Sequence, residues 1–530
     1  MNAAPLVPGA PANPAAPTKP KELNRAAILV VLGIFLSLLM GALDNFVVLT
    51  ALPNIVTDLH QPTGITFIVS AYLIGATVSV PIFAKLSDLL SRRDIFLAGL
   101  VVFIAGSALA GLSQNLDELI AFRGVQGFGS GGFFPIGIAI IAVLFSPETR
   151  ARLTGVFSGV FGIATVAGPF LGSFIVDHTS WRWVFYINIP IGLLGMAVLR
   201  TTLGPLRPAV RGTFDLGGAA LLSAWVSALM LALVQVSDAG WAWTDARILA
   251  LLLASVVLFV VFLLWELRTS TPLVPVRLFK DRVVASSSGA VFLSRFAMFP
   301  LITFVAVYVG IVILHGSSSA ADTVRDVLYF LVIPMVLGAV LGGQLLTRLS
   351  YRVLLMTGMT LATLGSLGLA LVSSSTPTWV FAFGFVPTGG IILPLIPIGL
   401  GLGFSFAAPL MAVQYQLPAK DVGAATGLVQ FIQSLGGAMG VSLLASFQEA
   451  RFTSLKPLLT GGGCGPGGPS APSCLAYASS LQNALVTSYD NVFVVMLGFF
   501  VAALVVSAFL TGRLPKGRHP RSSESGGPSP

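Results

Sequence analysis

Two charged residues lie deep inside apolar segments, where a charge is costly and is usually retained for function. Asp44 lies about 17 residues into the segment 27–50, and Arg123 lies about six residues into the segment 117–144. At about 1.5 Å per helical residue, both are expected in the outer half of a bilayer. A buried carboxylate beside an arginine can bind and release a proton when its exposure or its partner changes. We therefore interpret Asp44 and Arg123 as a proton-coupling pair, with a static ion pair between two helices as the alternative.

A second arginine, Arg295, lies about 11 residues into another apolar segment, near the membrane midplane. One interpretation is a contact with an anion or a headgroup in a cavity, and the other is a side chain that reaches toward the membrane surface or backbone carbonyls. Asp490 is one candidate partner. Six further polar residues are candidates for lining the same cavity: Asn45, Tyr308, Gln414, Tyr415, Gln430 and Gln433.

The composition identifies the elements that must position these side chains. Of the 530 residues, 55% are hydrophobic and only 9% are charged, whereas soluble proteins are about a quarter charged. This excludes a soluble enzyme, a nucleic-acid binder and a disordered scaffold, and it predicts an all-α membrane protein. All His and Cys residues fall outside the apolar segments, and no phosphate-binding Gly-x-x-x-x-Gly-Lys-Ser/Thr loop is present. We therefore expect no enzyme, metal site or ATP-driven pump.

Apolar runs long enough to cross a bilayer recur fourteen times. A membrane helix needs about 20 apolar residues. The predicted spans are 27–50, 65–87, 95–113, 117–144, 153–176, 183–203, 216–237, 247–265, 284–314, 325–347, 353–372, 386–413, 422–448 and 486–512.

The distribution of basic residues predicts the orientation. Cytoplasmic loops collect Lys and Arg. With the N-terminus inside, 22 of the 29 basic residues fall on the cytoplasmic side, five fall outside and two lie within spans. The sequence therefore predicts a multi-pass protein of the plasma (inner) membrane with both termini in the cytoplasm. The net charge of +9 mainly reflects this orientation and does not indicate nucleic acid.

The domain organisation follows from these spans. We expect a disordered tail over 1–26, a six-helix half over 27–203, two linker helices over 204–283, a second six-helix half over 284–512 and a tail over 513–530. An extracellular helical hairpin is predicted over 449–485. Because this segment is placed outside the cell, a Cys464–Cys474 disulfide is favoured over two free thiols.

Three motifs in the first half resemble signatures of the major facilitator superfamily. The segment 84–93 resembles its cytoplasmic loop motif at Asp88, Arg92 and Arg93, although Ala84, Leu89 and Ser91 depart from the pattern. The segment 123–129 matches Arg-x-x-Gln-Gly-x-Gly in full, and 168–173 resembles the exporter motif Gly-Pro-x-x-Gly-Gly with Ser173 in the last place. The segments 43–53 and 181–192 are similar to marks of the fourteen-span drug:proton antiporter family.

The resemblance implies the major facilitator fold, alternating access and export driven by inward proton flow, with no cofactor besides the proton gradient. It implies that Asp44 carries the proton and that Arg123 couples its charge to the conformational change. The remaining motif residues would act in gating and conformational change: Asp88, Arg92, Arg93, Gln126, Gly127, Gly168, Pro169 and Gly172.

The expected cargo is a hydrophobic or amphipathic small molecule with at most one positive charge. A pump for multiply charged cations would need more carboxylates at depth, and spans nine to thirteen have none. The expected function is multidrug efflux, and with it antibiotic resistance. Lipid or glycolipid export is the main alternative, because a protruding hairpin could shield a lipid tail or dock an accessory extracytoplasmic protein. Proton-driven nutrient uptake is a further alternative. We expect a monomer in the bilayer.

Overall fold

The computed structural model describes residues 25–59, 65–206, 212–238, 241, 243–309, 320–346, 348–375, 389–417, 419–455 and 472–512. The described residues are almost entirely helical. The helices of the first half are α1 (Arg25–Asp58), α2 (Ile65–Leu89), α3 (Arg92–Leu112), α4 (Leu116–Ser130), α5 (Phe133–Leu144), α6 (Pro147–His178), α7 (Trp183–Tyr186) and α8 (Asn188–Thr202). Then follow α9 (Leu216–Asp238), α10 (Ala246–Arg268), the 3₁₀ helix η1 (Val276–Lys280), α11 (Arg282–Val307), α12 (Ala320–Leu345), α13 (Tyr351–Ser375), α14 (Gly389–Gln416), α15 (Ala419–Leu455) and α16 (Pro472–Ser507).

Thirteen of the helical segments in the described residues are long and apolar enough to cross a membrane, and each falls on a predicted span. The remaining predicted span, 153–176, lies within the 32-residue helix α6. Two predicted spans are each divided into two consecutive helices. The span 117–144 is interrupted at Gly131 and Gly132, whose lack of a side chain favours a local break. The span 183–203 divides at Ile187, between α7 and α8.

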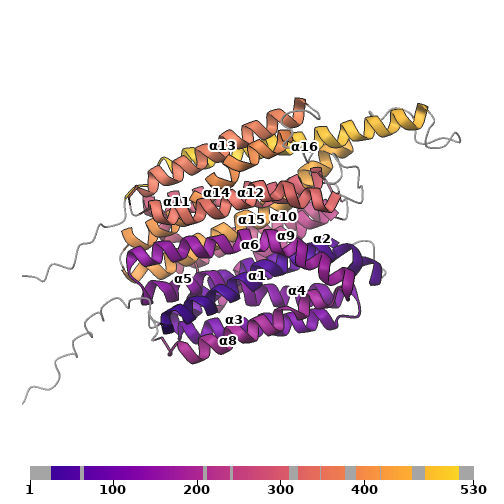
Figure 1. Ribbon diagram of the computed structural model, residues 1–530. Coiled ribbons are helices and arrows are strands. Elements are labelled where there is room, and N and C mark those ends of the chain that lie inside the picture. Colours follow the sequence, from indigo (N-terminus) through magenta and orange to yellow (C-terminus); the bar gives the residue numbers. More distant parts are fainter. Residues whose placement is uncertain are drawn as a thin grey trace, which may run out of the picture.

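The helices α1–α8 and the helices α11–α16 form two groups that lie side by side, with the linker helices α9 and α10 between them in sequence (Figure 1). In the first group α1 packs on α6 and α2 packs on α4, and in the second α12 and α13 pack on α14. The all-α architecture of membrane-spanning helices predicted from the sequence is therefore confirmed in the described residues.

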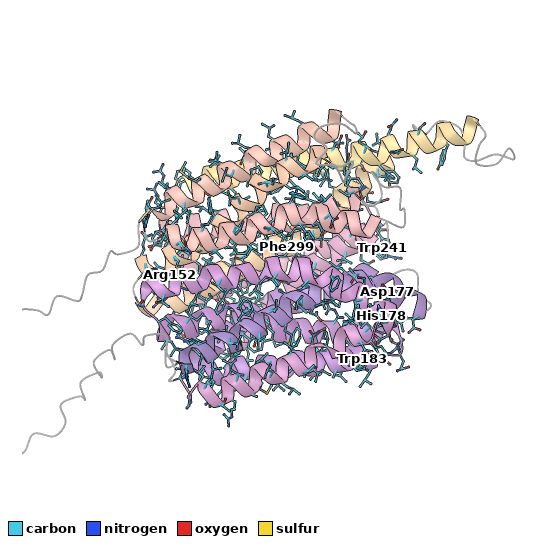
Figure 2. The ribbon with its side chains drawn as sticks, viewed as in Figure 1. Arg152, Asp177, His178, Trp183, Trp241 and Phe299 are labelled. Atoms are coloured by element: carbon cyan, nitrogen blue, oxygen red, sulfur yellow. The ribbon has the colours of Figure 1, made fainter. Side chains whose placement is uncertain are left out.

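The two ends of the bundle are distinguished by labelled side chains. Arg152 lies at one end, which we call the Arg152 end, and Asp177, His178 and Trp183 lie at the opposite end (Figure 2). This separation agrees with the alternating loops counted from the sequence.

The linker helices pack mainly on each other. Trp225 of α9 contacts the rings of Phe259 and Phe262 of α10 at centroid distances of 5.0 and 6.4 Å. Helix α9 also touches α2 and α15, one from each half, and Ser446 of α15 donates a hydrogen bond to the Leu233 carbonyl of α9. By contrast, only 17% of the residues in the most apolar stretch of α10 are buried, so most of this helix faces the surroundings of the protein.

Glycines permit the closest helix contacts in the first half. A Cβ on Gly75 would collide with the Gly124 carbonyl, and a Cβ on Gly127 would collide with the Tyr72 carbonyl. Helices α2 and α4 therefore pack backbone against backbone, as small residues allow in membrane proteins.

The helices α15 and α16 are the longest in the second half, at 37 and 36 residues. Helix α15 continues to Leu455 and α16 begins at Pro472, and Figure 1 shows α16 projecting beyond the other helices. The tip of the predicted hairpin and the Cys464–Cys474 pair lie outside the described residues.

Candidate functional site

Asp44 of α1 is the centre of a buried polar cluster in the first half. Its side chain is fully enclosed, and its Oδ2 atom accepts a hydrogen bond from the Arg123 guanidinium at 2.5 Å. Its Oδ1 atom accepts two more, from the amides of Gln126 at 2.7 Å and Asn188 at 2.8 Å. All three of these partners donate hydrogen bonds to the carboxylate, whose two oxygens can accept about four.

Arg123 of α4 is buried with several partners. Besides Asp44, its guanidinium donates to Gln126 Oε1 at 2.7 Å and to the Ile68 carbonyl at 3.5 Å. It also lies over the ring of Tyr72, 4.3 Å from the ring centroid. The aromatic face and the two neutral acceptors partly compensate the cost of burying this charge.

Ser107 of α3 joins the amides to the rest of the cluster. Its hydroxyl accepts from Gln126 and Asn188, both at 3.0 Å, and donates to the Phe185 carbonyl at 2.9 Å. Five side chains from four helices thus form one hydrogen-bonded unit, which we call the Asp44 network: Asp44, Ser107, Arg123, Gln126 and Asn188.

The local sequence explains how the network is assembled. Helix α4 begins after Asn115, whose side chain accepts from the Glu118 amide and caps the helix. Arg123 and Gln126 are three residues apart, so both project from one face of α4 toward α1. Asn188 is the first residue of α8, directly after the break that follows α7.

Sequence reasoning placed Asp44 and Arg123 at one depth, and the structure brings them into contact. It assigned Gln126 to conformational coupling, and the structure places that amide between the two charges. Ser107 and Asn188 were missed. Asn188 lies in the segment 181–192 that resembles the antiporter family, which was the available signal, whereas Ser107 had none.

At the Arg152 end, the loop-motif residues contact one another and the neighbouring helices. Arg92 pairs with Asp88 at 3.2 Å and donates to the Ala139 carbonyl at 3.4 Å. Arg93 instead pairs with Asp94 at 2.8 Å and donates to the Leu203 carbonyl at 3.1 Å. The motif therefore ties α2 and α3 to the middle of α5 and to the C-terminal end of α8.

The same end connects the two halves. A Cβ on Gly423, the fifth residue of α15, would lie 2.7 Å from an Asp88 carboxylate oxygen, so this carboxylate lies near the N-terminal end of α15. Along the same seam Thr77 and Ser434 share a hydrogen bond of 3.2 Å. Helix N-termini attract negative charge, so Asp88 stabilises the contact between α2 and α15.

The segment 269–281, which joins α10 to α11, lies over this junction, and we call it the strap. Lys85 of α2 donates to the Pro272 carbonyl at 3.0 Å, and Glu266 of α10 accepts from the Val274 amide at 3.1 Å. A cavity of about 160 Å³ lies between α2, the strap and α15, and Lys85 and Asp88 are among its lining residues. The linker is therefore attached to the seam between the halves.

The exporter-motif glycines lie where α6 meets α1. A Cβ on Gly168 would collide with the Phe46 side chain, and a Cβ on Gly172 would collide with Thr50. Both glycines thus permit close packing of α6 on α1, beside the turn that carries Asp44. Pro169 is within the α6 helix, and its side chain lies outside the described residues.

The predicted cavity residues do not form one cluster through any described contact. Asn45 donates to the Gly41 carbonyl of its own helix, and Tyr308 packs against Tyr489 and Phe493 within the second half. Arg150 of α6 lies 5.2 Å from the ring centroid of Tyr415 of α14, which adds a contact between the halves. The three glutamines in this set are buried or half-buried: Gln414, Gln430 and Gln433.

Arg295 of α11 is also buried, with 1% of its surface exposed. Its guanidinium carbon lies 3.6 Å from the ring centroid of Phe406 of α14, and one terminal nitrogen is 2.8 Å from the Met298 sulfur. None of the four ion pairs in the described part of the chain includes Arg295, so the suggested pairing with Asp490 is not found there.

Comparisons with known proteins agree with this architecture. The model of the Major Facilitator Superfamily matches residues 34–441. The chain is 34% identical over 428 residues to "Multidrug transporter protein MdtP" of Bacillus subtilis (strain 168), covering 81% of this chain and 76% of that protein. It is also 34% identical over 429 residues to "Multidrug resistance protein 3" of the same strain, covering 80% of each chain.

Two solved structures are similar in fold. One is the human organic anion transporter MFSD10 (TETRAN), with a TM-score of 0.56, 15% identity, and coverage of 90% of this chain and 100% of that one. The other is the proton:xylose symporter XylE, with a TM-score of 0.55, 15% identity, and coverage of 89% and 94%. The family match over most of the chain and the two Bacillus relatives show that the chain belongs to the major facilitator superfamily and to its multidrug exporters.

Proposed function

We propose that the protein is a proton-coupled antiporter that exports hydrophobic or amphipathic small molecules by alternating access. The observation that carries the proposal is the Asp44 network, a carboxylate buried with an arginine at membrane depth. A purely structural role would be met as well by apolar side chains of similar volume, because a buried ion pair adds little net stability.

The hydrogen bonds of Asp44 supply the coupling. Each of the three hydrogen-bond partners given above donates to the carboxylate, whereas a protonated carboxyl group carries an O–H donor that needs an acceptor. A proton on Asp44 therefore removes the counter-charge of Arg123 and adds a donor that none of these three contacts can accept, which weakens the contact between Asp44 and Arg123. Because Asp44 is on α1 and its partners are on α4 and α8, proton uptake changes how these helices pack.

The contacts at the Arg152 end provide the gate. We propose that this end faces the cytoplasm and that both termini lie there, in the plasma (inner) membrane. Asp88 against α15, Lys85 against the strap and Arg150 against Tyr415 then hold the two halves together on the inner side. This arrangement is the one expected when substrate is released outward, and it must separate when substrate enters from the cytoplasm.

The test is transport by the full-length chain in proteoliposomes under an imposed pH gradient. A lipophilic dye should accumulate with the gradient, and Asp44→Asn should abolish this accumulation while leaving gradient-independent exchange of the dye. Asp58→Asn is the matched control, because Asp58 also pairs with an arginine, Arg182, but at the surface. The proposal is contradicted if the wild-type protein accumulates the same amount of dye with and without the gradient, or if the Asp44→Asn variant still accumulates dye.

Lipid or glycolipid export is the second candidate, and the projecting helix α16, which follows the long helix α15, favours it (Figure 1). Such helices could shield an acyl chain as it leaves the protein or bind an accessory extracytoplasmic protein. A labelled phospholipid in the same proteoliposomes decides between the two candidates. Gradient-dependent export of the lipid but not of the dye favours lipid export, and inward accumulation would instead indicate proton-driven uptake.

A further inference from the structure

Arg295 is the buried charge for which the proposed proton coupling has no use. It is among the largest fully buried side chains, and its Nε atom has no hydrogen-bond partner. Its two described contacts are the ring of Phe406 and the sulfur of Met298. A thioether is a weak acceptor, and an aromatic face compensates only part of the cost of burying a guanidinium.

The first half shows how this chain compensates a buried arginine when it does so internally. Arg123 has a carboxylate, an amide oxygen, a carbonyl and an aromatic ring around it. Arg295 and Phe406 occupy the first and fourth helices of the second half, as Asp44 and Arg123 occupy the first and fourth spans of the first. In the second half the arginine has an aromatic partner in place of a carboxylate, so its counter-charge is missing from its described contacts.

A second unpartnered polar group lies on the same face of α11. The Ser288 hydroxyl is buried with 1% of the residue exposed, and it has no hydrogen-bond partner. Ser288 precedes Arg295 by two helical turns, so the two side chains share one face at a separation of about 10 Å along the axis. Together they form a polar stripe on a helix that also carries the buried serines Ser286, Ser287 and Ser294.

The stripe lies near the boundary between the halves. Phe299, one turn after Arg295, is half-buried and lies midway along the bundle (Figure 2), and Phe46 of α1 packs against the same apolar cluster of the second half as Phe299. An amphiphile that entered between the halves and moved these packed side chains apart would bring its head to Arg295 and its apolar body against Phe299 and Phe406.

We propose that Arg295 binds the negatively charged head of an amphiphilic substrate, so that the exporter selects lipophilic anions over lipophilic cations. This inference rests on the proposed export function and names its substrate class. The head is a carboxylate, sulfate or phosphate, because these groups form paired hydrogen bonds with a guanidinium. A cation at the same place would meet an uncompensated positive charge, which disfavours it.

Equilibrium binding tests the inference without any gradient, so its outcome is independent of proton coupling. Three dansyl-labelled dodecyl probes, ending in a carboxylate, an alcohol or a trimethylammonium group, are titrated against the full chain in phosphatidylcholine nanodiscs. The carboxylate probe should bind most tightly. Arg295→Gln should reduce its preference over the alcohol probe by about tenfold or more, the effect of losing one charge-assisted contact, and Arg295→Lys should retain most of the preference.

Arg247→Gln is the matched control, because Arg247 also lies over an aromatic ring, that of Trp241, but is exposed. It should leave the preference unchanged. Adding phosphatidylglycerol separates two sources of the anion: competition with the probe assigns the site to a lipid headgroup, and no competition assigns it to a free amphiphile. Equal binding of all three probes by the wild type, or an equal loss of all three in both Arg295 variants, overturns the proposal.

Discussion

Replacing either member of the buried Asp44–Arg123 pair is expected to destabilise the protein strongly. Replacing both should lower the free energy of unfolding by much less than the sum of the two single losses. Both side chains are almost fully enclosed, with side-chain exposures of 0% and 1%. Asp44→Asn leaves a guanidinium without its counter-charge, and Arg123→Met leaves a carboxylate held only by two amides. The double variant buries neither charge.

The magnitude follows from the burial. Breaking a buried ion pair by removing one partner costs about 3–5 kcal/mol, so each single variant should lose that much free energy of unfolding. Replacing both partners by uncharged groups is often close to neutral, so the coupling energy should reach at least about 2 kcal/mol. The exposed pair Asp58–Arg182, with side-chain exposures of 52% and 27%, should give a coupling of about 0–1 kcal/mol.

The assay is a double-mutant cycle on each pair, with reversible unfolding of the purified protein in mixed micelles followed by circular dichroism. Additive effects of Asp44→Asn and Arg123→Met, within about 0.5 kcal/mol, would refute the reasoning. A coupling at the exposed pair as large as that at the buried pair would refute it as well, because burial would then have no bearing on the result.

Three further outcomes are expected. Gly127→Ala should destabilise the chain by about 1–3 kcal/mol because its Cβ collides with a carbonyl of α2, whereas Gly498→Ala, with open space around it, should be neutral or stabilising in thermal unfolding. Asp88→Asn should raise the population opened at the Arg152 end about two- to fivefold, measured by spin-label distances between the halves, and Asp94→Asn should not. Asn188→Leu should lower the free energy of unfolding by about 1–3 kcal/mol and slow gradient-driven export, since it removes one hydrogen bond to Asp44 and one to Ser107. Unchanged export would argue against coupling through the Asp44 network.

The sequence predicted the fold and the two central charges because these depend on composition and on distance along a helix. Apolar length locates a span, and counting residues from its end gives the depth of Asp44 and of Arg123. The full match of 123–129 to a known motif also singled out Gln126, whose amide lies between the charges. These features can therefore be read from the sequence without knowing how the helices pack.

The remainder of the site depends on which way a helix is rotated and on contacts between distant segments. Ser107 resembles any other serine in an apolar helix until α3 is placed against α4. Asn188 reaches Asp44 because α7 and α8 meet at a break that hydropathy does not register. Likewise, Lys85 contacts a strap residue that is 187 positions away in the sequence, and Glu266 contacts one across a loop. No local sequence pattern indicates either contact.

The position of α9 makes the two sides of the molecule unequal for a lipid-dissolved compound. Along one seam between the halves α2 meets α15, and α9 touches both of these helices. Along the other seam α6 meets α12. A hydrophobic compound that diffuses within the bilayer would therefore meet α9 in addition to α2 and α15 at the first seam. At the second seam it would meet only α6 and α12. If a compound enters laterally from the bilayer, we therefore expect it to enter on the α6–α12 side, because the linker helix α9 covers only the α2–α15 side.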